Sequence, residues 1–341
     1  MSSEIDPGHI LQTGLGFFAS KTLLSAVELE LFTKLAAGAL TGPQIARQTG
    51  LHPRSLYDFL DALVSLGFLE RAGDGPEGQY SNTAETAAFL DKRSGAYVGG
   101  FLEMANARLY QFWGDLTTAL KTGKPQNELK TRKGNPFEIL YADERRLEQF
   151  LRAMHGVQIG NFVALASKVN FSHYASFLDV GGANASLSTI VARQFPQLHC
   201  TSFDLAPVVP IATRLIAAAG LADRVKAVPG DFFKDALPRA DVITMGNILH
   251  DWDERQKKAL IAKAYAAVNP GGLFIAIENV IDDARRKNSF GLLMSLNMLI
   301  ELPGGFDYTG AQFNTWCLQA GFARTEILPL AGPTSAAIAY K

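Results

Sequence analysis

The sequence has few cysteines, almost no net charge and no uninterrupted hydrophobic run, and each absence excludes a class of protein. Cys200 and Cys317 are the only cysteines, so a disulfide framework is excluded, and their spacing is not that of metal ligands. A formal net charge of −1 gives no general attraction to nucleic acid or to an anionic membrane. Lys21 and two glutamates interrupt the apolar stretch 10–32, which is therefore expected to be a buried helix and not a membrane span. We expect a reducing compartment, with the cytoplasm as the default.

Length and composition predict a globular protein with more than one domain. The 341 residues are 48% hydrophobic and 19% charged, which is enough to bury a full core. Changes in the pattern predict three parts: an N-terminal unit over 1–95, a helical connector over 96–175 and an α/β domain over 176–341.

The N-terminal part has the pattern of a mostly helical winged helix-turn-helix. A helix with one apolar face is predicted over 53–66, and a hairpin is predicted within 68–81. DNA-binding proteins share this pattern, but Asp58, Asp61 and Glu70 belong to a set of acidic residues that outnumbers the basic ones where phosphates would lie. We therefore favour a structural or dimer-forming domain and expect no nucleic-acid partner.

From residue 176 onward, strands and helices alternate as a Rossmann-like, doubly wound parallel sheet requires. Strands are expected at 177–180, 199–204, 225–228, 242–245 and 273–278. Helices are expected between them, notably over 207–219 and 254–268, and a hairpin of 323–330 and 335–340 ends the chain.

The stretch from Phe177 to Ser186 would join the first strand to a helix through a glycine-containing turn. Such a turn brings backbone amides and a helix N-terminus to a ligand, although an ordinary strand-to-helix loop has the same pattern. Asp179, Asp204 and Asp231 fall at or just after the ends of three successive strands. They would therefore line one edge of a bound ligand.

The turn lacks the pattern of a dinucleotide site. Where G-x-G-x-x-G would be needed, the sequence has Gly181, Ala183 and Ser186, so a pyrophosphate cradle is poorly supported. A cofactor with a ribose and an adenine but no phosphate fits better, and S-adenosylmethionine is that cofactor.

Six short motifs, together with the winged pattern, give nearly the whole chain a resemblance to the two-domain plant-type O-methyltransferases, which include caffeate and hydroxyindole O-methyltransferases. The motifs are Asp179-Val180-Gly181-Gly182, Phe203-Asp204-Leu205, Gly230-Asp231-Phe232-Phe233, Leu249-His250-Asp251-Trp252, Asn269-Pro270-Gly271-Gly272 and Pro303-Gly304-Gly305. The resemblance implies a class I S-adenosylmethionine-dependent methyltransferase that acts on a small molecule. It also implies a homodimer, because the family's N-terminal domain usually serves dimerisation.

The same resemblance implies a cofactor site built from the strand ends. It assigns Gly181 to the methionine part of the cofactor, Asp204 and Leu205 to its ribose, and Asp231 and Phe232 to its adenine. The full set is Asp179, Gly181, Gly182, Asp204, Leu205, Asp231, Phe232 and Gly246. The chain departs from the family where Ala183 and Ala185 replace common glycines and where Gly246 replaces a lysine of plant members. The two methyl groups would affect cofactor binding if the backbone needs positive φ there.

An oxygen acceptor needs a base, and His250 is the candidate. The methyl group of the cofactor is already electrophilic, so an enzyme must mainly align the reactants and exclude water. A phenol of pKa about 10 is protonated at neutral pH, and an imidazole of pKa about 6.5 can take its proton. His250 follows the fourth strand, at the ligand-binding edge of the sheet. A capping or buried structural histidine has the same pattern.

By resemblance, Glu278 and Asp307 match the acids that flank this histidine, although plant members have a glutamate at the second position. Their alternative roles are a loop cap and a solvated turn residue. Asp251 and Asp253 are expected to start the helix at Glu254, since acids favour a helix N-terminus. No metal site is expected.

The resemblance also assigns a set of substrate-wall residues, with core packing as the alternative role for each. The set is Trp113, Met154, His155, Phe162, Met294 and Met298. Arg108 or Arg152 would bind an acceptor that carries a carboxylate, or would lie at the surface.

The residues leave the accepting atom open. Some relatives of this fold hydroxylate, or methylate carbon or sulfur, and a small thioether acid such as methylthiohydroxybutyrate, on the route to dimethylsulfoniopropionate, is the main alternative to a phenolic or heteroaromatic hydroxyl. We favour oxygen because His250, Glu278 and Asp307 are all present.

Overall fold

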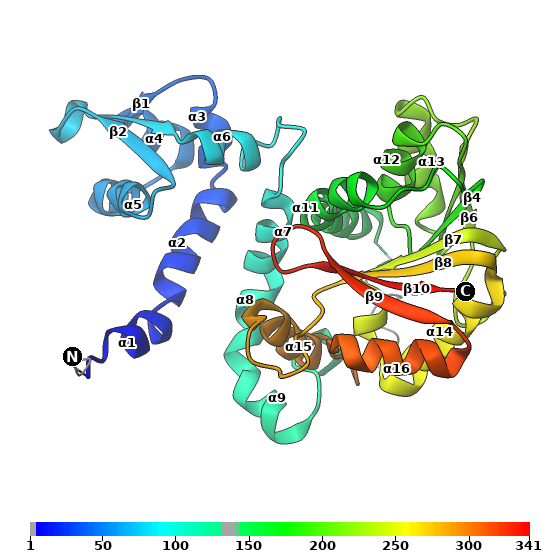
Figure 1. Cartoon of the computed structure of the whole chain (residues 1–341). Helices are drawn as coiled ribbons and strands as arrows, with labels where there is room; N and C mark the ends of the chain where they lie inside the picture. The colour runs from blue at the N-terminus through cyan, green and yellow to red at the C-terminus, as the bar shows by residue number, and fades with distance from the viewer. Residues whose placement is uncertain (1–4, 131–140, 142) are drawn as a thin grey trace. The chain divides into compact units, whose positions relative to one another are not determined.

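The computed structural model describes residues 5–130, 141 and 143–341, which form two compact units, Met1–Gln111 and Phe112–Lys341. Each unit is described by itself (Figure 1). The helical segment expected over 96–175 is divided between the two units. The three-part division predicted from the sequence stays a prediction.

The first unit contains the predicted helices and hairpin. Helices α4 (Gly42–Thr49) and α5 (Pro53–Ser65) precede strands β2 (Leu69–Ala72) and β3 (Gln79–Asn82), which pair antiparallel. A strand that the sequence did not reveal, β1 (Leu40–Thr41), pairs with β3 and gives the sheet order β1-β3-β2. A capping box and a proline in the first turn start α4, which is why this short segment is helical.

The expectation of one buried helix over 10–32 is wrong. The segment forms α1 (Gly8–Gly14), α2 (Phe17–Glu28) and the start of α3 (Leu31–Leu35), and Glu30 separates the last two with a left-handed φ of 56°. Only the C-terminal part of this segment joins the core of the unit, through residues such as Leu31.

The N-terminal helices expose large apolar side chains. Ile10 is 73% exposed and Phe18 is 59% exposed, because nothing in the described part of the unit covers them. By length and composition alone, Gly8–Glu28 could cross a membrane, a test that core helices of soluble proteins also pass. An exposed apolar face of this kind marks an interaction surface.

The segment between the hairpin and the second sheet is mostly helical, as expected. Its elements are α6 (Ala84–Phe89), α7 (Gly99–Met104), η2 (Ala105–Leu109), α8 (Tyr110–Phe112), η3 (Trp113–Asp115), α9 (Leu116–Thr122), η4 (Glu128–Lys130) and α11 (Glu144–Lys168). The carboxylate of Asp143 accepts from the Arg146 N–H and caps α11, the long helix of the second unit.

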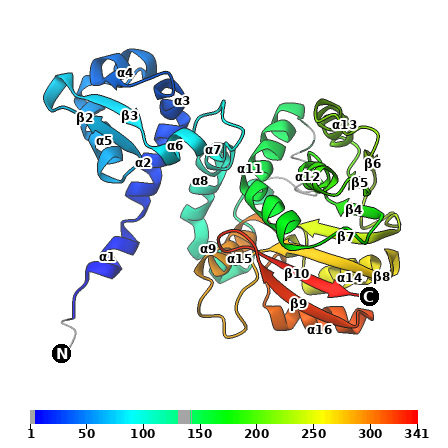
Figure 2. The same ribbon diagram turned by 45° about the horizontal axis from the view of Figure 1, so that its top comes forward.

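The second unit is built on a seven-stranded sheet, which confirms the predicted Rossmann-like α/β fold (Figures 1 and 2). Its strands are β4 (Ser176–Val180), β5 (His199–Asp204), β6 (Val225–Pro229), β7 (Ala240–Gly246), β8 (Val268–Glu278), β9 (Arg324–Pro329) and β10 (Ser335–Tyr340). The order is β6-β5-β4-β7-β8-β10-β9, in which the first five strands are parallel and β10 is antiparallel to both neighbours.

Helices cover both faces of this sheet. On one side lie α11, α12 (Ser186–Gln194) and α13 (Val209–Ala218), and on the other lie α14 (Glu254–Ala267) and α16 (Gly310–Ala320), as Figure 2 shows. Successive strand residues therefore enter opposite cores: Phe177 packs into one and Leu178 into the other. Cys200 and Cys317 lie in different cores and are free.

The parallel strands bring their carboxyl ends to one edge of the sheet. At this edge β4 ends at Val180, β5 at Asp204, β7 at Gly246 and β8 at Glu278. The sequence motifs singled out above follow these ends, so this edge is where a ligand is expected.

Candidate active site

The glycine turn after β4 is shaped by close backbone approaches. Gly181 has a φ of 69°, and a Cβ atom built there would lie 2.3 Å from Ile248 Cδ1. A Cβ atom at Gly182 would lie 2.3 Å from Ser202 Oγ. Neither position has room for a side chain, so the two glycines keep bare backbone at the edge of the sheet.

The two alanines of the turn adopt the conformation that glycine usually supplies. Ala183 has a φ of 49° and Ala185 a φ of 60°. A residue with a Cβ atom loses about 1–2 kcal/mol in the left-handed region. The two alanines therefore put strain into the turn, which glycines at the same φ would avoid.

Asp204 holds this turn in place. Its Oδ2 accepts from the Ala183 N–H at 2.8 Å, and its Oδ1 accepts from the Leu205 N–H at 2.7 Å. Burial raises the pKa of Asp204 to about 6 in spite of these two bonds. The predicted ribose-binding pair, Asp204 and Leu205, is thus brought directly beside the glycine turn.

Asp179 lies deeper than the other predicted cofactor residues. It accepts from Thr244 Oγ1 at 2.7 Å, and burial raises its pKa to about 7. Its Oδ2 lies 3.1 Å from the place where a Cβ atom of Gly182 would be. These contacts put Asp179 behind the turn, as a support for Gly182.

At the end of β6, Asp231 is held by its own loop. It accepts from the Phe233 N–H at 2.9 Å and pairs with Lys234 at 2.9 Å, and these contacts outweigh burial and lower its pKa. The ring of Phe232 packs edge-on against Trp252, with 6.0 Å between the ring centroids. A bare backbone turn, a carboxylate at the next strand end and an aromatic ring fit a nucleoside-containing cofactor such as S-adenosylmethionine.

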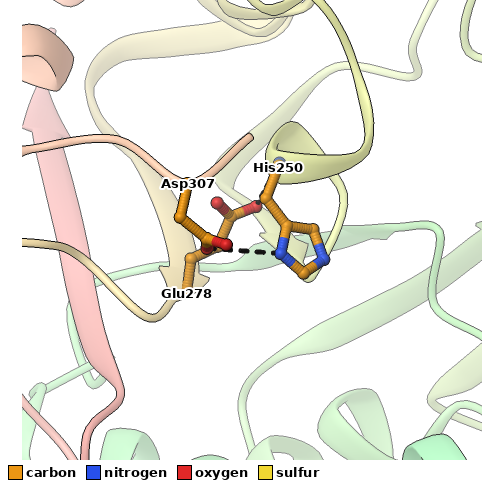
Figure 3. Close-up of side chains that lie close together, drawn as sticks. All are labelled: His250, Glu278 and Asp307. Carbon is orange, nitrogen blue, oxygen red and sulfur yellow. Dashed lines mark hydrogen bonds and ion pairs between the residues drawn. The ribbon is translucent and has the colours of Figure 1, made fainter. Parts of the chain in front are cut away.

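His250 lies in the 3₁₀ turn η5 (Leu249–Asp251) that follows β7. Its ring Nδ1–H donates to Asp307 Oδ1 at 3.3 Å, so these two residues lie together as expected (Figure 3). Glu278 Oε1 accepts from the backbone N–H of His250 at 3.2 Å, and its role as an acid that orients the ring stays a prediction. Glu278 therefore fixes the loop, and Asp307 fixes the ring.

Asp251 does not start the following helix, which corrects the expectation from the sequence. Its Oδ1 lies 3.4 Å from His250 Nε2, so the second ring nitrogen also faces a carboxylate. Asp253 alone is the N-cap of α14, where it forms a capping box with Gln256. The short 3₁₀ turn between β7 and α14 is what directs Asp251 to the histidine.

The carboxylates change the charge of this site. Burial lowers the pKa of His250, but Asp307, Asp251 and Glu278 together outweigh burial and raise it well above the ordinary value of 6.5. Burial raises the pKa of Glu278, and it raises that of Asp251 to about 7. The three carboxylates therefore favour the charged form of the His250 ring.

The sequence matches the family described as the O-methyltransferase domain over residues 113–323 and the O-methyltransferase dimerisation domain over residues 11–92. The chain belongs to the O-methyltransferase family. Its relatives include "Tetracenomycin polyketide synthesis 8-O-methyl transferase TcmO" of Streptomyces glaucescens, 41% identical over 335 residues, which are 98% of this chain and 97% of the relative. They also include "N,N-dimethyltransferase OxyT" of Streptomyces rimosus, 36% identical over 278 residues, which are 81% and 79% of the two chains.

Among solved structures, that of human N-acetylserotonin methyltransferase in complex with SAM resembles this chain with a TM-score of 0.92 and 28% identity, covering 100% of this chain and 99% of that one. The predicted family, fold and cofactor are confirmed. This O-methyltransferase uses S-adenosylmethionine to methylate a small molecule.

The residues predicted to line the substrate pocket of this O-methyltransferase form two groups, one associated with α15 and one on α11. Trp113 Nε1–H donates at 2.9 Å to Asn297 Oδ1, on α15 (Ser289–Glu301), which also carries Met294 and Met298. The second group lies on α11 and consists of Met154, His155 and Phe162.

Two residues of the α11 group, His155 and Phe162, contact the segments at the carboxyl ends of β4 and β7. The ring of His155 donates from Nδ1 to Ser186 Oγ at 2.7 Å, since the Ser186 hydroxyl itself donates to Asn184. Phe162 Cε1 lies 3.7 Å from the place where a Cβ atom of Gly246 would be. The role of each wall residue stays a prediction. Of the two arginines proposed for a carboxylate, Arg152 is exposed and Arg108 belongs to the first unit.

Two residues of the site were not found from the sequence. Tyr141 lies near both Asp204 and Asp251, and burial followed by these two carboxylates raises its pKa. Lys257 lies near Glu278 and Asp307 in the interior. A signal for Lys257 existed, because it lies three and four residues before Leu260 and Ile261 and so shares the buried face of α14.

The expected absence of a metal stays a prediction. Ligand atoms of His250, Glu278 and Asp307 lie within 4.8 Å of one another, a spacing that a cation would also accept. Addition of a chelator to the active enzyme decides the point, and we expect no loss of turnover.

Proposed function

We propose that this O-methyltransferase transfers the methyl group of S-adenosylmethionine to a phenolic hydroxyl of an aromatic metabolite, of the polyketide or hydroxyindole type, with His250 as the general base. The observation that carries the proposal is the placement of His250 beside the glycine turn. Its loop touches that turn through Ile248, and its Nδ1 is held by Asp307. The relatives named for a polyketide and for N-acetylserotonin support the substrate class.

Different residues of the chain would have different roles in such a reaction. When bound, the cofactor supplies an electrophilic methyl group on a positively charged sulfur, and a nearby positive charge favours the neutral form of an imidazole. Asp204 and the glycine turn would hold the cofactor, and Asp307 keeps the His250 ring in one orientation. Nε2 is then the atom that takes the proton of the hydroxyl.

The carboxylates around His250 add a condition, because they favour the charged form of its ring. A protonated imidazole has no lone pair, so Nε2 must lose its proton before it can accept one. Asp251, whose carboxylate lies 3.4 Å from Nε2, is placed to share that proton. Turnover should therefore increase with pH through the neutral range.

A panel of acceptors tests the accepting atom. N-acetylserotonin and a hydroxynaphthoate represent phenols, an aromatic amine represents nitrogen, and methylthiohydroxybutyrate represents the thioether alternative. We expect methylated product, identified by mass spectrometry, from the phenols with at least one order of magnitude higher kcat/KM. Preferred transfer to the amine, as the name of OxyT suggests for that relative, or to the thioether would overturn the oxygen assignment.

We also propose that the chain forms a homodimer through its first unit. The support is the matched dimerisation domain together with the exposed apolar side chains of α1, α2 and the residue that caps α1, which are Ile10, Leu11, Leu15, Phe17 and Phe18. Light scattering at micromolar concentration should give twice the mass of 36.9 kDa. A monomer mass at that concentration would remove the proposal.

A further inference from the structure

Lys257 is a buried cation in a position where α14 needs an apolar residue. Its exposed fraction is 0%, and within residues 5–130, 141 and 143–341 it is the one lysine or arginine that is buried. Burial lowers its pKa to about 8, against the opposing effect of four carboxylates. A lysine is seldom kept in such a place unless its charge is used.

The amine of Lys257 touches both loops that build the His250 site. Its Nζ donates to the backbone oxygen of Trp252, two residues after His250, and lies 3.5 Å from the ring centroid of Phe306, the residue before Asp307. The Phe306 N–H also donates to the backbone oxygen of His250 at 2.8 Å. Lys257 thus lies where the His250 loop meets the Asp307 loop.

The loops can meet because Gly304 and Gly305 leave no side chain between them. A Cβ atom at Gly305 would lie 3.0 Å from the backbone oxygens of His250 and Asp251, and Gly304 has a φ of 96°. On its other side the Asp307 loop is held by Ser295, whose Oγ accepts from the Asp307 N–H at 3.2 Å.

The cluster around Lys257 has more negative than positive groups. Lys257 faces Glu278, Asp307, Asp251 and Asp253, and the first three of these also face His250. Tyr308 faces Glu278 and Asp307 from the same loop and stays neutral, because burial and Glu278 raise its pKa. Without Lys257, His250 would be the one cation that faces these carboxylates among the residues that the structure describes.

The buried carboxylates of the cluster have few hydrogen-bond donors among the described residues. Asp307 Oδ2 is buried and accepts no hydrogen bond from any residue that the structure describes, and the buried carboxylate of Glu278 faces the hydroxyl of Tyr308. A buried carboxylate oxygen without a donor is costly unless a cation is nearby. Lys257 and His250 are the two cations in that position.

We propose that Lys257 is a positioning residue, which joins the His250 loop to the Asp307 loop and supplies the second positive charge of the cluster, so that His250 can release its proton without leaving the carboxylates unbalanced. This inference rests on the proposed role of His250 as a base. It predicts that removal of the Lys257 charge makes His250 hold its proton more tightly, because the same carboxylates then have a single cation.

The test is a titration of the His250 ring by NMR in the full-length protein labelled at histidine Cε1, and it needs no acceptor. The chain has 6 histidines, and the His250 signal is the one that His250→Gln removes. Lys257→Met keeps an unbranched side chain without the charge. We expect its His250 midpoint to lie at least about one pH unit above that of the wild type, a tenfold change in the protonation ratio.

Lys258→Met is the matched control. Lys258 is the next residue of α14 and forms a surface ion pair with Glu254, so its removal should leave the His250 midpoint unchanged. The double variant Lys257→Met/Asp251→Asn removes one charge of each sign and should return the midpoint toward the wild-type value. A purely structural role for Lys257 would leave the midpoint of Lys257→Met within about 0.3 unit of the wild type, and that result would overturn the inference.

If Lys257→Met does not fold, the comparison moves to the Asp251→Asn background. Addition of Lys257→Met to that variant should raise the His250 midpoint by about one unit or more, and equal midpoints in the two proteins would overturn the inference. The result is separate from the proposed function. Undiminished methyl transfer by His250→Gln would contradict the role of the base, whereas the titration decides the role of Lys257.

Discussion

Two regions at the ligand-binding edge of this sheet are built by different means: the cofactor edge, which is the proposed cofactor site after β4 and β5, and the acceptor edge, which is the proposed acceptor site around His250. The cofactor edge consists of backbone N–H groups and residues with left-handed φ that are close together in the sequence. Both oxygens of Asp204 accept from neighbouring amides there. At the acceptor edge, charged side chains from separate segments are buried together around His250, and some of their oxygens have no donor in the described part of the chain. The first edge depends on backbone shape and the second on balanced charge.

This difference predicts which property of the enzyme a substitution at each edge should change. A change of backbone conformation at the glycine turn should alter cofactor affinity and leave the proton chemistry intact. A change of charge near His250 should alter the rate and its pH dependence while the cofactor still binds. The following experiments separate the two edges, from the largest expected effect to the smallest.

Replacement of His250 by glutamine should have the largest effect. Glutamine can keep a hydrogen bond to Asp307 but cannot accept a proton, so kcat for a phenolic acceptor should decrease by about 10²- to 10⁴-fold. Calorimetry should show nearly unchanged binding of S-adenosylmethionine. A loss of cofactor affinity as large as the loss of rate would mean that the two edges are not separate.

Asp204→Asn should mainly lower the affinity for the cofactor. The substitution replaces a carboxylate that accepts from the Ala183 and Leu205 amides and is placed to accept from a ribose, so we expect affinity to decrease by about 10- to 100-fold. Asp223→Asn is the control, because Asp223 is an exposed surface residue. Equal calorimetric titrations for the wild type and Asp204→Asn would contradict the assignment.

The pH dependence should report the charged cluster. The carboxylates raise the pKa of His250 above 6.5, so the active neutral form increases with pH beyond the range of an ordinary histidine. Between pH 6 and 8, kcat/KM for an acceptor of pKa about 10 should increase up to about tenfold per pH unit. A plateau that begins near pH 6.5 would show that the cluster does not hold the ring in its charged form.

The smallest effect is expected at Ala183. Because its φ is 49°, Ala183→Gly removes left-handed strain, and part of the gain is offset by the greater freedom of glycine in the unfolded chain. We expect stabilisation by about 0.5–1 kcal/mol, or an increase of about 2 °C in Tm. Ala185→Gly should gain less, because the methyl group of Ala185 is fully buried and would be lost. A decrease in Tm for Ala183→Gly would remove the strain argument.

The strand ends and the turn of the cofactor edge could be predicted from the sequence because the information for them is local, and the cofactor-binding roles of their residues stay predictions. Asp179, Gly181 and Asp204 follow directly from strand ends and a turn, and the five parallel strands were placed to within a few residues except at the start of β8. The short strand β1 was missed, because two residues carry no alternation. The exposure of α1 and α2 was missed as well, since an apolar pattern does not say what covers it.

The acceptor edge could be predicted only in part. His250 and Asp307 were named and do meet, but the backbone role of Glu278, the turn of Asp251 toward the ring and the burial of Lys257 depend on how separate segments pack. The pKa of His250 depends on all of these neighbours together. No single motif encodes it, because the carboxylates that raise the pKa of His250 come from separate segments.

The most direct test of the central claim compares wild type and His250→Gln over a series of substituted phenols of decreasing pKa. A phenol that is already ionised at the assay pH needs no base. The rate ratio of wild type to variant should therefore fall from about 10²–10⁴ for a phenol of pKa about 10 to less than about 10 for a phenol of pKa below 7. A ratio that does not change with the acidity of the phenol would show that His250 only orients the acceptor, and would contradict its role as the general base.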